Sequence, residues 1–383
     1  MHNNNRSTLS STVRSLLIAG GLITASLAFS TGVSAADLTI NQSLPDSAIL
    51  SKGPGGESAV SAKTLSLSET ELQQIRDGGY TAAIAMHYAG NDWSQAQING
   101  LKAAFDRMGI DVVAVTDAQF KSEKQAADIE TLLARHPDVI VSIPVDAVST
   151  AHAFKRAAEA GVKLVFMDNK PNGLEAPADY ISVVSADNYG NGIEAAHILA
   201  NSLNGKGKIG VIYHAADFFV TKQRTDAFEA TIKSEYPGIE IVARGGISGP
   251  NDGEKVASAM LTKNPTLDGI FVVWDVPAEG ALSAARAAGR SDLAITTIDL
   301  GINVALDIAR GGPIKGLGAQ LPYEQGTAEA ILAGYALLGK KAPSYVAVPA
   351  LSVTQDNVLD AWQLVYNQPA PSMIQDVAKR NRK

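Results

Sequence analysis

The chain has 383 residues, a formal net charge of −7 and no cysteine. Its basic residues are scattered along the sequence, which favours neither a nucleic acid nor an anionic membrane surface as a partner. Without disulfides the folded chain must be stabilised by core burial, and its length is sufficient for two domains. The histidines lack metal-ligand spacing, so we expect no metal site, and nothing in the sequence suggests a cofactor.

Residues 1–36 have the pattern of an export signal. Arg6 and Arg14 precede an apolar stretch over 16–29, and the small residues at 33–36 offer a cleavage site. The stretch is interrupted by glycine and hydroxyl residues, so a membrane anchor is the less favoured alternative. No cysteine follows it, which excludes a lipid-modified cysteine anchor. The sequence therefore predicts a periplasmic protein that is not inserted in the membrane after the signal is removed.

Residues 37–78 form an extension ahead of the main pattern. The part up to residue 63 lacks clear periodicity and contains a Gly-Pro-Gly-Gly cluster at 53–56, which predicts a flexible or draped segment. Ser68-Glu69-Thr70-Glu71 is a capping box, and Gly78-Gly79 provides a stop, so we expect one short helix between them.

From residue 81 onward, apolar runs of strand length alternate with amphipathic stretches of helix length. We expect strands at 82–86, 112–115, 139–143, 163–167, 180–184, 209–213, 239–243, 270–273, 295–298 and 314–318. The intervening helices are predicted near 92–108, 122–135, 147–160, 189–203, 222–236, 253–263, 278–288 and 303–310. Two successive sets of this kind predict an α/β protein with two doubly wound, parallel-sheet lobes.

Four of the predicted strands stop on a polar side chain. The run 164–167 ends at Asp168-Asn169, the run 270–273 ends at Trp274-Asp275, and the runs 295–298 and 314–319 end at Asp299 and Gln320. In open parallel sheets ligands bind at the carboxyl ends of the strands. Carboxylates, amides and a tryptophan without cysteine or metal ligands are suited to hydrogen bonding and stacking on a small polyhydroxylated molecule.

Several segments, in the right order, resemble those of periplasmic sugar-binding proteins of ABC transporters, specifically the ribose-binding type. The resemblance runs from about residue 80 to 353 and rests on Ala89-Gly90-Asn91-Asp92-Trp93, Met167-Asp168-Asn169, Lys222-Gln223-Arg224, Trp274-Asp275, Asp299 and Ala319-Gln320-Leu321-Pro322. It implies a ligand site made of Asn91, Trp93, Asp168, Asn169, Arg224, Trp274, Asp299 and Gln320.

The chain also departs from that pattern. Asn169 stands where the family's ribose binder has an arginine, Ser94 where it has a second aromatic residue, and Trp274 where it has an asparagine. Ribose itself is therefore not carried over as the ligand. The extension at 37–78 has no counterpart in the family pattern.

The resemblance further implies a three-strand hinge. It places the crossings near 186–187, 320–321 and 350–352, with an N-terminal lobe of 79–186 plus 322–350 and a C-terminal lobe of 187–321 plus 351–383. A hinge of this kind permits the lobes to close around a ligand.

The predicted function is that of an exported receptor, expected to be a monomer, which captures a small neutral sugar or polyol and delivers it to an ABC transporter permease. One alternative is a carbohydrate-processing enzyme that uses Asp168 and Asp299 as an acid–base pair, but Arg224 would favour ionisation of both. Another is a periplasmic sugar sensor for a chemoreceptor. Helix caps or a structural salt bridge are the simpler roles for Asp168, Asp299 and Arg224. We expect Arg224 and Asp299 to face an open cleft, so that their removal costs little stability without ligand.

Overall fold

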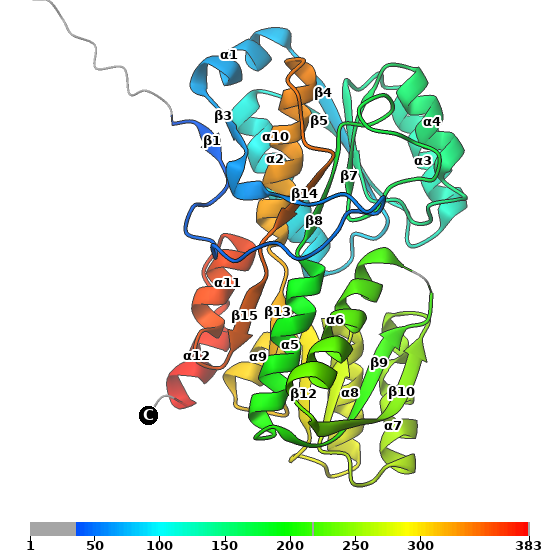
Figure 1. Ribbon diagram of the computed structural model, residues 1–383. Coiled ribbons are helices and arrows are strands. Elements are labelled where there is room, and N and C mark those ends of the chain that lie inside the picture. Colours follow the sequence, from blue (N-terminus) through cyan, green and yellow to red (C-terminus); the bar gives the residue numbers. More distant parts are fainter. Residues whose placement is uncertain (1–35, 217, 382–383) are drawn as a thin grey trace, which may run out of the picture. The chain divides into compact units, whose positions relative to one another are not determined.

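The computed structural model describes residues 36–216 and 218–381, so the predicted export signal, apart from Ala36, lies outside the described residues. Two β-sheets, each with helices on both faces, form the main body (Figure 1). The α/β class predicted from the alternating pattern is confirmed. Within the described ranges, no helix is long and apolar enough to cross a bilayer.

The first sheet has seven strands, and all its pairs are parallel. Its order is β2 (Val60–Ser61), β14 (Tyr345–Val348), β8 (Ser182–Ala186), β7 (Lys163–Met167), β6 (Val139–Ser142), β4 (Thr81–Met86) and β5 (Asp111–Asp117). Helices α3 (Ser122–Leu133) and α4 (Ala151–Glu159) share one apolar cluster with this sheet. Helices α2 (Asp92–Met108) and α10 (Pro322–Leu337) pack together and belong to the cluster on the other face. Buried strands covered on both faces explain the nearly continuous apolar runs in the sequence.

The second sheet has six strands. Its order is β10 (Gly238–Ile247), β9 (Lys206–His214), β11 (Gly269–Val272), β12 (Ala294–Ile298), β13 (Ile314–Ala319) and β15 (Leu351–Thr354). The helices of this part are α5 (Asn188–Ser202), α6 (Phe219–Glu235), α7 (Gly253–Lys263), α8 (Asp275–Ala287), α9 (Ile302–Ala309), α11 (Val358–Tyr366) and α12 (Ser372–Asn381). Strand β15 is antiparallel to β13, whereas only parallel pairs were expected. The register pairs Leu351, the first residue of β15, with Ala319, the last residue of β13, so β15 begins where β13 ends and runs in the opposite direction.

The chain passes between the two sheets three times. It leaves β8 for α5 at Asp187, leaves β13 for α10 at Gln320-Leu321, and leaves β14 for β15 at Pro349-Ala350. The backbone N–H of Asp187 donates to the Val348 carbonyl oxygen at 2.8 Å, so the first and third crossings lie side by side.

The extension is more ordered than its composition predicts. Strands β1 (Leu38–Thr39) and β3 (Ser66–Leu67) pair with each other, and β2 adds an edge strand to the seven-stranded sheet. Strands of two residues give no periodic signal, which is why the sequence predicted a draped segment. The one predicted helix is present as α1 (Glu69–Gly78), with the Ser68 capping box formed and Gly79 in the left-handed region at φ 62°.

Three helix starts differ from the predicted positions by three residues or more, and one of them is α6, which begins at Phe219 rather than near 222. Helix α4 begins at Ala151 rather than near 147, and residues 147–150 form turns in which the backbone N–H groups of Val148 and Ser149 donate to the Asp146 carboxylate. Helix α8 begins at Asp275, three residues before the expected start, so the polar strand end and the helix start coincide there.

Candidate functional site

The candidate site lies where strands of both sheets end. Asp168 follows β7, Asp299 follows β12, and Gln320 follows β13. Asp168 and Asp299 have φ angles of 56° and 70°, in the left-handed region that residues with a Cβ seldom adopt. Such backbone conformations persist where the surrounding structure enforces them, and they cluster at functional sites.

A buried ion pair forms the centre of the site. The Nη1 atom of Arg224, on α6, donates to Asp299 Oδ2 at 3.2 Å, and the Nε2 atom of Gln320 donates to Asp299 Oδ1 at 2.8 Å. The exposed fractions of Arg224, Asp299 and Gln320 are 4%, 9% and 3%. The expectation that Arg224 and Asp299 face an open cleft is therefore wrong for this conformation, since both are buried.

Two residues connect this pair to Asp168 in the other lobe. The Nε atom of Arg224 donates to Asn188 Oδ1 at 2.8 Å, and the Nδ2 atom of Asn188 donates to Ser185 Oγ at 3.0 Å. Ser185 Oγ in turn donates to Asp168 Oδ1 at 2.7 Å. One hydrogen-bonded chain thus runs through the first crossing and joins the strand ends of both sheets.

The site carries more acidic than basic groups. Burial raises the pKa of Asp168 to about 6, although Ser185 and Arg224 act in the opposite direction. Burial, and then the neighbouring Asp299 carboxylate, raise the pKa of Asp275 well above its ordinary value. Arg224 supplies positive charge to this cluster, because its guanidinium contacts Asp299 and lowers the pKa of Asp168. In the part of the chain that the structure describes, no group of three or more acidic or histidine side chains is arranged to hold a metal ion.

Two tryptophans lie at helix starts beside this cluster. Trp93 is in the first turn of α2, its Nε1 atom is buried without a hydrogen-bond partner, and its ring meets the His87 ring edge-on at 6.2 Å between centroids. Trp274 precedes α8 and meets the His214 ring edge-on at 5.4 Å. Burial lowers the pKa of His87 to about 4, so this ring is neutral at physiological pH.

The remaining two predicted residues have local hydrogen bonds. Asn91 caps α2, because its Oδ1 atom accepts a hydrogen bond from the backbone N–H of Ser94 at 2.9 Å. The Asn169 Oδ1 atom accepts from the Lys170 backbone N–H at 3.0 Å. Among the described residues, neither of these two side chains is hydrogen-bonded to the chain that joins Asp168 to Gln320. These are the simpler capping and turn roles.

Sequence reasoning missed Ser185, Asn188 and Asp275 as site residues. Ser185 and Asn188 flank the first crossing, and Asp275 is the second residue of a strand-end pair that was already noted for its tryptophan. The signal for Asn188 was available, since it follows the apolar strand β8 directly after an aspartate. A polar residue at that place also starts helix α5, so the pattern alone does not distinguish the two roles.

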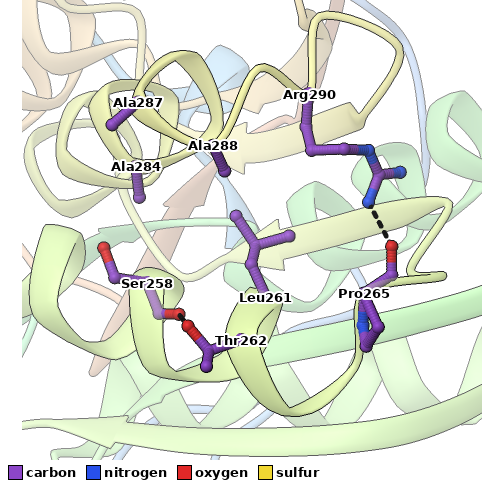
Figure 2. Close-up of a pocket in the computed structure, with 8 residues that line it drawn as sticks. All are labelled: Ser258, Leu261, Thr262, Pro265, Ala284, Ala287, Ala288 and Arg290. Carbon is purple, nitrogen blue, oxygen red and sulfur yellow. Dashed lines mark hydrogen bonds between the residues drawn. The ribbon is translucent and has the colours of Figure 1, made fainter.

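Two surface pockets lie away from this cluster. One of about 350 Å³ lies between the carboxyl-terminal ends of α7 and α8, and its lining includes Leu261, Ala284 and Arg290 (Figure 2). These helix ends lead into β11 and β12, so they lie at the amino end of the sheet, away from Asp299. The other, of about 230 Å³, is lined by residues of β1, α2 and α10.

Comparison with known proteins identifies the family. Residues 82–341 match the model of the periplasmic binding protein domain, so the chain belongs to this family. It is 24% identical over 287 residues to the ribose import binding protein of Escherichia coli K12, covering 74% of this chain and 92% of that protein. It is also 28% identical over 216 residues to the D-ribose/D-allose-binding protein of Pseudomonas aeruginosa, covering 55% and 67%.

Solved structures agree on the fold. An ABC transporter solute-binding protein from Agrobacterium vitis, bound with α-D-tagatopyranose, superimposes with a TM-score of 0.69 at 23% identity and covers 76% of this chain and all of that chain. A second protein from the same organism, with bound allitol, gives a TM-score of 0.64 at 25% identity, covering 74% and 98%. The family is one of binding proteins, so the chain is a binding protein and not an enzyme.

Proposed function

We propose that the chain is an exported receptor that holds a small neutral sugar or polyol between its two lobes and delivers it to an ABC transporter permease. The observation that carries the proposal is the hydrogen-bonded chain from Asp168 through Ser185, Asn188 and Arg224 to Asp299. It places charged groups at the carboxyl ends of strands in both sheets and leaves the Gln320 Oε1 atom buried without a partner.

The chemistry of these groups suits hydroxyl-rich ligands. A sugar hydroxyl donates to a carboxylate such as Asp168 or Asp299 and accepts from the guanidinium of Arg224, and both bonds are charge-assisted. The ring of Trp93 or Trp274 covers the C–H face of the ligand without competing for hydrogen bonds. An acidic sugar is disfavoured, because the carboxylates outnumber the single arginine and would repel an anion.

The biological setting is part of the same proposal. The relatives named above are import binding proteins or binding proteins for sugars, and the amino-terminal sequence has the pattern of an export signal. A monomeric periplasmic receptor that closes on its ligand and then meets a membrane permease fits both. The two-lobe division at 186–187, 320–321 and 350–352 is the arrangement that would allow closure.

A ligand screen tests the proposal. Purified mature protein is heated with pentoses, hexoses and polyols of three to six carbons, and with a uronic acid and a trisaccharide for comparison. A ligand present at a hundred times its Kd stabilises the folded state by about 2.7 kcal/mol, which raises the melting temperature. Tighter binding of the uronic acid or the trisaccharide than of every neutral monosaccharide and polyol would refute the proposed ligand class.

Two further measurements locate the site and the motion. Asp299→Asn should lose affinity, while the matched change Asp292→Asn, in an exposed pair with Arg290, should not. Small-angle scattering should give a smaller radius of gyration with saturating ligand than without it. Equal affinities of the two variants would remove Asp299 from the site.

A further inference from the structure

The extension reaches across the first crossing between the lobes. Its residues 44–60, which we call the hinge strap, run from the packed residue Leu44 to the start of β2 (Figure 1). The matched family domain begins only at residue 82, so the hinge strap lies outside it. Nothing in the proposed function requires this segment, and its position calls for a role of its own.

The two ends of the hinge strap are fixed to the N-terminal lobe. Before it, the backbone N–H of Asn41 donates to Glu324 Oε2, on α10, at 3.1 Å. After it, Val60 and Ser61 pair with β14. The turn at Gly53 also packs against this strand, because a Cβ atom placed on Gly53 would lie 2.9 Å from Tyr345 Cγ.

The middle of the hinge strap is bound to the first crossing. The backbone N–H groups of Leu50 and Ser51 donate to the two carboxylate oxygens of Asp187 at 3.0 and 2.9 Å, and Ser51 Oγ donates to Asp187 Oδ1 at 2.9 Å. Ser51 Oγ also accepts from the backbone N–H of Tyr189 at 2.9 Å. Asp187 immediately precedes Asn188, the residue that holds both Arg224 and Ser185. The strap is therefore one residue away from the chain that connects the two halves of the site.

A further pair of contacts reaches the C-terminal lobe itself. The backbone N–H of Lys52 donates to Gln223 Oε1 at 3.3 Å, and Gln223 Nε2 donates to the Lys52 carbonyl oxygen at 3.4 Å. Gln223 lies in the second turn of α6, beyond the crossing. A rotation of the lobes about the crossings moves Gln223 further than Asp187, so it separates Lys52 from Gln223 before it strains the contacts at Asp187.

The lobes also touch at a second place in this conformation. The backbone N–H of Ile302, on α9, donates to Asp92 Oδ2, on α2, at 3.0 Å. The strap contacts are thus formed in an arrangement in which the two lobes meet. Any contact that is made only in this arrangement stabilises it relative to an open one.

From these contacts we propose that the hinge strap ties the two lobes together through Ser51 and Gln223 and thereby favours the closed arrangement. The consequence for ligand binding rests on the proposed function. A receptor whose binding-competent arrangement is more populated binds its ligand more tightly, without any new contact to the ligand. The strap then raises affinity from outside the site.

The test uses the full-length mature protein with Ser51→Ala and Gln223→Ala combined. The chain has no cysteine, so single cysteines placed at the exposed positions Val148 and Lys255 carry spin labels that report the distance between the lobes. The ligand-free double variant should show a larger share of long distances than the wild type. Its affinity for the sugar or polyol found in the screen should fall roughly three- to tenfold.

The control is Gln73→Ala, which removes a glutamine whose side chain contacts Asp77 within its own helix α1. This variant should keep the wild-type distances and affinity. Wild-type distances and affinity in the double variant would overturn the proposal that the hinge strap favours the closed arrangement. The distance measurement needs no ligand, so it decides the question even if no sugar or polyol binds, a result that would refute only the proposed function.

Discussion

Arg224→Ala should weaken both the ligand-free fold and ligand binding. The guanidinium donates to Asn188, to the Val273 carbonyl oxygen and to Asp299, and it is almost fully buried. Removing one partner of a buried pair leaves the other charge uncompensated. This costs roughly 3–5 kcal/mol when the remaining charge has no other hydrogen-bond partner. Gln320 still donates to Asp299, so we expect a loss of about 3 kcal/mol in the free energy of unfolding.

Urea unfolding without ligand measures this loss. The matched control is Arg244→Ala, which breaks the half-exposed pair with Glu229 and should cost less than about 1 kcal/mol. Calorimetry should show affinity for the bound sugar falling by roughly tenfold to over a hundredfold. Because Arg224 lowers the pKa of Asp168, that pKa should rise in the variant. Unfolding free energy and affinity that both match those of the control would refute the structural and functional reasoning together.

Three further changes test other groups. Glu329 is buried with both carboxylate oxygens unpartnered, and burial raises its pKa well above 4.5. The folded protein therefore loses stability as the pH rises from about 4.5 through the raised pKa. Glu329→Gln should abolish this loss in unfolding curves recorded at several pH values. Asp168, with a pKa of about 6, is protonated below that pH and then accepts poorly from a ligand hydroxyl; affinity measured by calorimetry should decline below about pH 6 in the wild type but not in Asp168→Asn. Trp274→Ala should lower affinity about tenfold and admit larger sugars, as measured by competition of hexoses against pentoses; wild-type affinity and an unchanged preference would mean that Trp274 only packs the fold.

Much of the fold was predictable because its signals are local. Continuous apolar runs mark strands that are buried on both faces, and the Ser68 capping box with Gly79 marks α1 without any tertiary information. The edge strand β2 was not predictable, because a two-residue strand is defined only by its partner β14. The antiparallel strand β15 likewise depends on how the chain returns from β14.

The candidate site was predictable in composition but not in connectivity. Polar residues at strand ends pointed to Asp168, Asp299 and Gln320, and the last two share a hydrogen bond. No sequence pattern indicates that hydrogen bonds through Asn188 and Ser185 connect Arg224 to Asp168, because that route depends on how α6 packs beside the first crossing. The degree of burial was also missed, since it is set by how closely the lobes approach one another.

The left-handed backbone at Asp168 and Asp299 limits how this binding protein can diversify. At φ angles of 56° and 70°, aspartate, asparagine and glycine are tolerated, whereas β-branched or bulky side chains are strained. Evolution can therefore exchange a carboxylate for an amide at these two positions but cannot easily enlarge them. Trp93 and Trp274, at helix starts, are not among the residues with positive φ, so their backbone places no such limit on the side chain. Under the proposed function, hydrogen bonding to the ligand and selection of its size would thus be set at separate positions, and one could change while the other is retained.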